Sequence, residues 1–178
     1  MLRIVTFRVL CFAMAVTLVS APGLRAQQAK DAIPGPVPAQ IPAAKKVFIA
    51  NGGVDGTALE VCRRAGEPDQ PYNHLYAGMK NWGRYELVDS PADADLVFEI
   101  SFTAPSVQCG TSTCYGPQLG LAILDRKTHF KLWTITEPVE GAIRKATWLK
   151  NFDQAMTTLV EDIKHLDSQP KAPESTQK

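Results

Sequence analysis

No block of like charges occurs in this 178-residue chain, whose 19 Lys and Arg nearly balance its 18 Asp and Glu. A protein that binds nucleic acid or an anionic membrane surface through electrostatics needs a concentrated basic patch, and this sequence provides none. The charge pattern therefore predicts neither nucleic acid nor a membrane surface as a partner.

Long apolar runs are also scarce. The run from Val9 to Val19 follows Arg3 and Arg8 and contains no acidic residue. A membrane-spanning helix needs about 20 apolar residues, so this shorter run is typical of a cleavable signal peptide. The best cleavage position follows Ala26, which predicts an exported chain, periplasmic or secreted, with no transmembrane segment after removal of residues 1–26.

After the predicted cleavage, the rest of the chain divides by composition into a spacer, a domain and a tail. Cleavage would remove three arginines and no acid, leaving 16 basic against 18 acidic residues and a formal charge of about −2. Residues 27–45 are rich in Pro and Ala, which predicts a flexible spacer. Residues 168–178 are polar and contain two prolines, which predicts a disordered tail. The remaining segment, 46–167, has the size of a single domain.

Hydrophobic periodicity predicts the elements of this domain. Leu96 to Thr103 alternates between apolar and other residues, which predicts a strand with one buried face. Pro71 to Trp82 has apolar residues at helical spacing and Gly83 at its end, which predicts a helix. The other expected elements are a strand at 47–50 ended by a turn at 51–53, a strand at 85–88, a helical turn capped by Ser90, strands at 119–123 and 129–136, and a helix from Asn151 to Leu166.

The expected order of elements is therefore β-α-β-β-β-β-α. Short connections between consecutive strands favour antiparallel pairing, and two one-sided helices can cover one face of a sheet. We predict an α+β two-layer sandwich, with a mainly antiparallel sheet of four to five strands and two helices on one face. Residues 54–70 and 105–117 are expected to form loops.

A resemblance to an uncharacterised family of exported bacterial small α/β proteins is carried by the segments WGRYELV, PADADLVFEI, LAILD, LWTITEPVE and NFDQAMTTLVEDIK. The element order is loosely similar to the N-terminal domain of TolB and to domains of envelope-assembly lipoproteins. The resemblance extends from Lys46 to Leu166 and consists of core and turn patterns. It implies a fold and an exported location, and it assigns no active-site residue.

Three cysteines remain after the predicted cleavage. Cys109 and Cys114 flank four polar residues, an arrangement that favours a disulfide in an oxidising compartment. Three cysteines permit three different pairs, so Cys62 is either free or paired in another way. A metal site made of the three thiols and His74 is the alternative, but the ligand spacing is not that of a zinc motif. The sequence predicts no metal and no cofactor.

Candidate catalytic residues are few. Asp93, Asp95 and Glu99 are close in sequence and could form a small acidic site, although nothing marks them as a general acid and base pair. The glycine-rich segment Asn51–Gly56 lacks both the G-x-G-x-x-G spacing and a P-loop lysine, so it predicts a turn instead of a phosphate site. We therefore predict no catalytic residue.

The export signal, the spacer and the lack of a catalytic set favour a non-enzymatic module of the periplasm or envelope. Such a module would bind another protein or assist an assembly, and an edge strand could accept a strand of the partner. One alternative is a small secreted hydrolase that uses Asp55, Cys62 or Glu99. The other is a protein that binds a small apolar ligand under its helices. The sequence indicates no oligomeric state.

Overall fold

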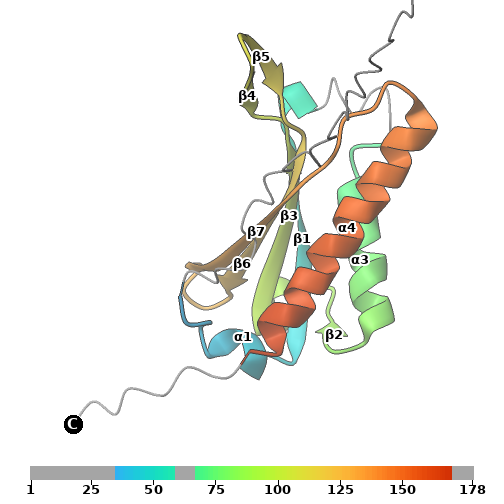
Figure 1. Cartoon of the computed structure of the whole chain (residues 1–178). Coiled ribbons are helices and arrows are strands. Elements are labelled where there is room, and N and C mark those ends of the chain that lie inside the picture. The colour runs from blue at the N-terminus through green and yellow to red at the C-terminus, as the bar shows by residue number, and fades with distance from the viewer. Residues whose placement is uncertain (1–34, 59–66, 170–178) are drawn as a thin grey trace, which may run out of the picture. The chain divides into compact units, whose positions relative to one another are not determined.

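Five strands form the main sheet of the protein, whose computed structural model describes residues 35–58 and 67–169. Across the sheet they lie in the order β2-β1-β3-β6-β7 (Figure 1). The predicted signal peptide with its cleavage position after Ala26 lies outside the described residues, as does Cys62. The strands are β1 (Lys46–Val54), β2 (Glu86–Leu87), β3 (Leu96–Thr103), β6 (Gln118–Asp125) and β7 (Lys131–Pro138).

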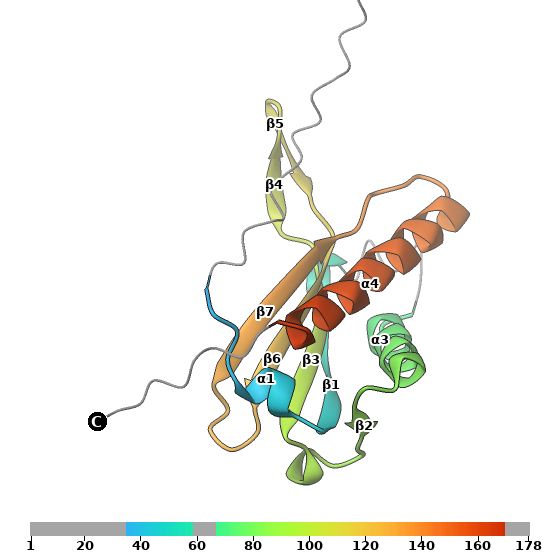
Figure 2. The ribbon, with the colours of Figure 1, turned by 60° about the horizontal axis from the view of Figure 1, so that its bottom comes forward.

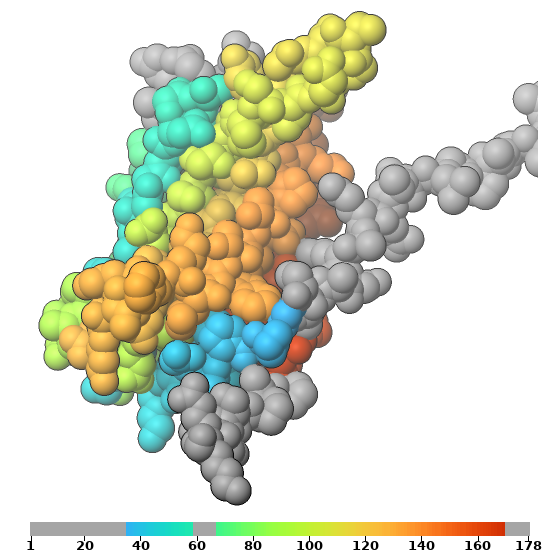
Figure 3. Space-filling view, turned by 90° about the vertical axis from the view of Figure 1, so that its left-hand side faces the viewer, coloured from blue at the N-terminus to red at the C-terminus, as the bar shows by residue number. Residues whose placement is uncertain are grey.

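Two long helices, α3 (Gln70–Trp82) and α4 (Lys145–Asp167), lie on the same face of this sheet (Figures 1 and 2). Neither α3 nor α4 lies across the opposite face of the sheet, which Figure 3 shows with residues of the α1 region at one end of it. The α+β class, the two layers and the order of the main elements are therefore as predicted. A short helix α1 (Gln40–Ala43) and a 3-10 turn η1 (Pro91–Asp93) are additions.

The sheet is mixed, where the sequence predicted a mainly antiparallel one. β1 runs parallel to both of its neighbours, β2 and β3, whereas the pairs β3–β6 and β6–β7 are antiparallel. The cause is α3, which carries the chain from the end of β1 back to its beginning, so that β2 starts in the same direction. η1, where Ser90 Oγ accepts a hydrogen bond from the Ala92 N–H at 3.2 Å, then leads to the other side of β1.

The turn predicted at 51–53 is instead the last part of β1. The register between β1 and β3 shifts between Asn51 and Gly53, where Gly53 has a φ of +83°. Asn51 Oδ1 accepts a hydrogen bond from the Gly53 N–H at 2.9 Å. A Cβ atom on Gly52 would lie 3.0 Å from the Ile100 carbonyl oxygen, which leaves room only for glycine. The glycine-rich segment therefore serves strand pairing.

The helix-stop signal predicted from the sequence is confirmed, whereas the predicted helix start is not. α3 ends as predicted at Gly83, which has a φ of +69° and whose N–H donates to the Met79 carbonyl at 3.1 Å. α4 begins at Lys145, before the predicted start at Asn151. Asn151 is not a cap but lies inside α4, where its Nδ2 donates to the Glu140 carbonyl at 2.9 Å. The buried stripe of α4 already begins at Trp148, which explains the longer helix.

Part of the segment predicted as a spacer packs against the domain. Val37, Ile41 and Ala44 are buried in the same core as the sheet and the helices. The packed part of the chain therefore begins before the predicted boundary at Lys46. In the described residues no helix is both long and apolar enough to cross a membrane.

Asp95 fixes the entry to β1. Its Oδ2 accepts hydrogen bonds from the Lys45 N–H at 2.8 Å and the Lys46 N–H at 2.9 Å, and these bonds hold the pKa of Asp95 below its ordinary value. A lowered pKa stabilises the fold above about pH 4, and this contribution is lost as the pH falls through that value and below.

We expect Asp95→Asn to lower the free energy of unfolding at pH 7 by about 0.5–1 kcal/mol, because Asp95 is exposed and the solvent screens its charge. The loss should shrink as the pH is lowered from 5 to 3. Urea unfolding at several pH values measures this, with Asp93→Asn as the matched control on an exposed neighbour. If the free energy of unfolding changed with pH by the same amount in wild type and in Asp95→Asn, this expectation would be contradicted.

Candidate functional site

The two central strands β3 and β6 continue beyond the main sheet as a separate two-stranded hairpin. This hairpin is made of β4 (Ser106–Cys109) and β5 (Ser112–Tyr115), where the sequence predicted a loop. β4 and β5 pair antiparallel with each other and with no other strand. The hairpin projects past the end of the sheet (Figures 1 and 2).

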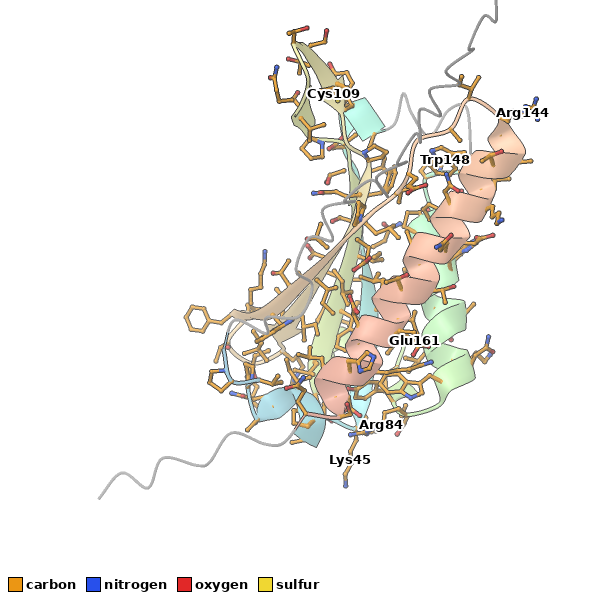
Figure 4. The ribbon with its side chains drawn as sticks, viewed as in Figure 1. Lys45, Arg84, Cys109, Arg144, Trp148 and Glu161 are labelled. Atoms are coloured by element: carbon orange, nitrogen blue, oxygen red, sulfur yellow. A yellow bond between two sulfur atoms is a disulfide. The ribbon has the colours of Figure 1, made fainter. Side chains whose placement is uncertain are left out.

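A disulfide between Cys109 and Cys114 joins the two strands of the hairpin. It is the pair that the sequence spacing favoured, and its Cα atoms are 5.9 Å apart (Figure 4, where Cys109 is labelled). At the base of the hairpin the Gly116 N–H donates to the Pro105 carbonyl at 2.9 Å. The hairpin is thus closed covalently near its tip and by a backbone bond at its base, which reduces the conformations open to it.

The hairpin is exposed and carries no charge. Seven of its eight strand residues are exposed and the remaining one, Cys114, is half-buried. No Asp, Glu, Lys, Arg or His occurs from Ile100 to Leu124, in a chain of which 21% is charged. Within residues 105–117, Ser, Thr, Gly and Tyr are together the most frequent kinds of residue, and the binding loops of antibodies are rich in Ser, Gly and Tyr as well.

Neighbouring strand residues point to opposite faces, so the hairpin has two distinct sides. Val107 pairs with Cys114, which places Val107 and the disulfide on one side. Tyr115 pairs with Ser106 on the other side. Val107 is 41% exposed and Tyr115 is 58% exposed, so each side presents one large apolar group to solvent.

The edge of the main sheet at β7 offers only a short row of outward-pointing backbone groups. The Val139 N–H donates to the Pro117 carbonyl at 2.8 Å, so residues 139 and 117 form a hydrogen-bonded pair adjoining β7 and β6. In an antiparallel pair, hydrogen-bonded and non-hydrogen-bonded residue pairs alternate. The backbone groups of Thr134 and Thr136 therefore point away from β6, toward the open edge of β7. A register shift opposite Ile123 and Leu124 bounds this short edge at one end, and Pro138 bounds it at the other. Bulges and prolines are devices that prevent strand addition. At β7 the edge open to a partner strand is therefore short, and on the other side of the sheet β2 pairs only with Lys46 and Val47 of β1.

A groove of about 410 Å³ lies between α3 and α4. Two of its lining residues are in close contact, since a Cβ atom on Gly78 would lie 3.0 Å from Val160 Cγ2. At the groove, His74 Nδ1 lies 3.2 Å from Asp153 Oδ1, and both side chains are well exposed. This contact is exposed to solvent, so it adds little to any binding in the groove.

Of the acidic candidates from the sequence, Asp55 and Asp95 accept backbone hydrogen bonds, whereas Asp93 and Glu99 are exposed. Asp55 accepts hydrogen bonds from the Ala58 N–H at 2.5 Å and the Ala104 N–H at 3.0 Å. Asp95 is bonded to the start of β1, and Glu99 is exposed on the face of the sheet opposite α3 and α4. Within residues 35–58 and 67–169 no group of three or more His, Cys, Asp and Glu side chains could hold a metal ion.

One polar cluster, which we call the Arg84 clamp, consists of Arg84, Tyr85 and Asp167. Arg84 Nε lies 2.9 Å from Asp167 Oδ2, and the Tyr85 hydroxyl donates to Asp167 Oδ1 at 3.0 Å (Figure 4). Burial, together with the Asp167 charge, raises the pKa of Tyr85 above its ordinary value. Arg84 also donates to the carbonyls of Pro42 at 3.0 Å and Ala44 at 3.3 Å, so the cluster joins α1 to the end of α4. Its role is structural.

The fold and surface define a small α+β sandwich with a projecting, disulfide-closed hairpin. No family model and no curated protein sequence matches the chain. Among solved structures it is similar to a homolog of a neuraminyllactose-binding hemagglutinin from Helicobacter pylori, with 10% identity, a TM-score of 0.42, and coverage of 76% of this chain and 96% of that one.

Two lipoproteins are also similar in structure. One is lipoprotein GNA1162 from Neisseria meningitidis, with 9% identity, a TM-score of 0.34, and coverage of 66% of this chain and 99% of that one. The other is a minor lipoprotein from Acinetobacter baumannii, with 10% identity, a TM-score of 0.35, and coverage of 72% and 98%. At these values the similarity transfers no site residue.

Proposed function

We propose that the protein is exported by means of residues 1–26 and acts in the periplasm or envelope as a non-enzymatic module that binds another protein through the β4–β5 hairpin. One observation carries this proposal: the hairpin is exposed, uncharged and closed by a disulfide. The disulfide also supports the exported location, because such bonds persist in oxidising compartments.

The hairpin has the physical properties of a contact element. It is already ordered, so binding loses little conformational entropy. It has no charge that would lose its hydration at an interface, and hydroxyl and amide groups remain for hydrogen bonds. The sheet and helices below it provide a rigid support, as scaffolds do for binding loops.

The other predicted functions have no comparable observation. The carboxylates of Asp55 and Asp95 bind backbone N–H groups, as structural carboxylates do. The region beneath the helices, where an apolar ligand was expected, is occupied by packed rings, among them Phe98 and Phe102. The likeness to TolB and to envelope-assembly domains stays a prediction, and it is compatible with a binding module.

In-cell cross-linking of the tagged, exported protein, followed by mass spectrometry, tests the proposal. The variant joins Pro105 to Gly116 through an Asn-Gly turn, which closes two-residue hairpins readily and removes residues 106–115. We expect wild type to recover a reproducible partner, and the shortened variant to recover roughly tenfold less of it or none. Losing about 1.4 kcal/mol of binding free energy lowers the affinity tenfold, and the variant lacks the whole contact element.

Two controls make the comparison decisive. β4 and β5 pair only with each other, so the shortened variant should unfold at the same urea concentration as wild type. Phe130→Ser changes an apolar residue that is 73% exposed elsewhere and should retain the partner. Equal recovery of the partner by the shortened variant would overturn the hairpin as the contact element.

A further inference from the structure

The hairpin has apolar groups on both sides, which limits how a partner can bind it. Val107 and Tyr115 lie on opposite faces, and they are two of the large apolar side chains that the described surface exposes. A partner that laid a flat surface against one face would leave the other apolar group in water. Covering both requires that the partner surround the hairpin.

The size of the hairpin leads to the same conclusion. Each strand has four residues, so a face is only about 13 Å long at about 3.3 Å per residue. A stable protein interface buries about 800 Å² on each partner, far more than one face of two such strands offers. Both faces, both edges and the tip together provide much more contact area.

The lack of charged side chains removes the usual obstacle to enclosing a surface segment. An ionised side chain without a partner is costly to bury, and the hairpin contains none from Pro105 to Pro117. The Gly110–Thr111 tip is small and also uncharged. Elsewhere, the turn between β6 and β7 contains Asp125, Arg126 and Lys127, so it could not be enclosed in the same way.

We propose that the whole β4–β5 hairpin inserts into an uncharged, concave cleft of a partner protein, in preference to lying against the partner through one face. This inference rests on the proposed function and specifies its binding mode. Long loops that enter concave surfaces bind in this manner, with rigid aromatic and apolar groups as anchors. Tyr115 and Val107 are the anchors, and the disulfide keeps them on opposite sides.

Site-specific photocross-linking in the exporting cell tests this mode. The photoreactive amino acid p-benzoylphenylalanine is placed separately at positions 107, 111 and 115, and at position 130 as a control. Insertion predicts an adduct of the same mass from all three hairpin positions and none of that mass from position 130. A contact through one face predicts an adduct from 107 or from 115 alone.

A charge at the tip provides the quantitative readout. Thr111→Asp should reduce the adduct from position 115 roughly tenfold or more, because an enclosed tip would bury an unpaired carboxylate. Thr111→Asn has nearly the same shape without the charge and should retain the adduct. Because residue 111 is exposed in the structure, neither change should affect folding.

The outcomes separate the inference from the proposed function. An adduct from one face only, unaffected by Thr111→Asp, would overturn insertion and leave the hairpin as a binding element that contacts its partner through that face. An adduct of twice the mass of this chain would overturn it in favour of a second copy. No adduct from any hairpin position would contradict the proposed function itself.

Discussion

Replacing Phe102 with alanine is expected to lower the free energy of unfolding by about 3–5 kcal/mol. Phe102 is completely buried at the end of β3. Its ring meets those of Trp148 and Phe152 edge to face, with centroids 6.2 and 6.1 Å away, and those two rings stack on each other at 5.4 Å. Alanine would leave a cavity where the sheet and α4 meet, and urea unfolding followed by circular dichroism measures the loss.

The matched control is Phe130→Ala, which removes the same ring from a position that is 73% exposed. It should change the free energy of unfolding by less than about 0.5 kcal/mol, as surface substitutions usually do. Similar losses for the two variants would mean that the Phe102 cluster is not the part of the core that holds α4 on the sheet.

Replacing Asp167 with alanine is expected to lower the free energy of unfolding by about 1.5–3 kcal/mol, the range for hydrogen bonds to charged groups. The Asp167 side chain is 12% exposed and accepts from both Arg84 and Tyr85, so its loss leaves two donors without this acceptor. The guanidinium would then turn toward solvent and weaken its bonds to the carbonyls of Pro42 and Ala44.

Hydrogen exchange locates this effect, since it reports opening segment by segment. In Asp167→Ala the amides of residues 40–44 should exchange faster than those of β3. Glu161→Ala, which removes an exposed carboxylate of α4 that pairs with Lys164, is the control and should leave both segments unchanged. Uniformly faster exchange across the domain would show that Asp167 supports the whole fold and not the attachment of α1.

Some elements could be predicted from the sequence because their side chains repeat with the period of the structure. β3 was predicted at its observed bounds because its apolar residues alternate with other residues. The end of α3 was predicted because Gly83 follows its last apolar residue. Periodicity identifies a strand but not its neighbour, and for this reason the parallel pairing of β1 was missed. The direction of β2 depends on α3 crossing over the sheet, which no local pattern records.

The candidate site was missed for a related reason. β4 and β5 are exposed on both faces, so no alternation of apolar and polar residues marks them. The available signals were Gly110 at the turn and the two cysteines across the strands, which predicted the disulfide without predicting the strands. The burial of Val37 and Ile41 was missed because proline-rich composition was taken as a property of the whole segment 27–45.

The Arg84 clamp also determines how the domain would bear a mechanical load. Arg84 holds the carbonyls of Pro42 and Ala44, which precede β1, and Asp167, the last residue of α4. α1 lies at the end of the sheet opposite the β4–β5 hairpin (Figure 1). Tension applied through the chain before Gly35 would therefore reach α1 and the clamp first. Such tension would act at the end of the sheet away from the hairpin, which is closed separately by the Cys109–Cys114 disulfide.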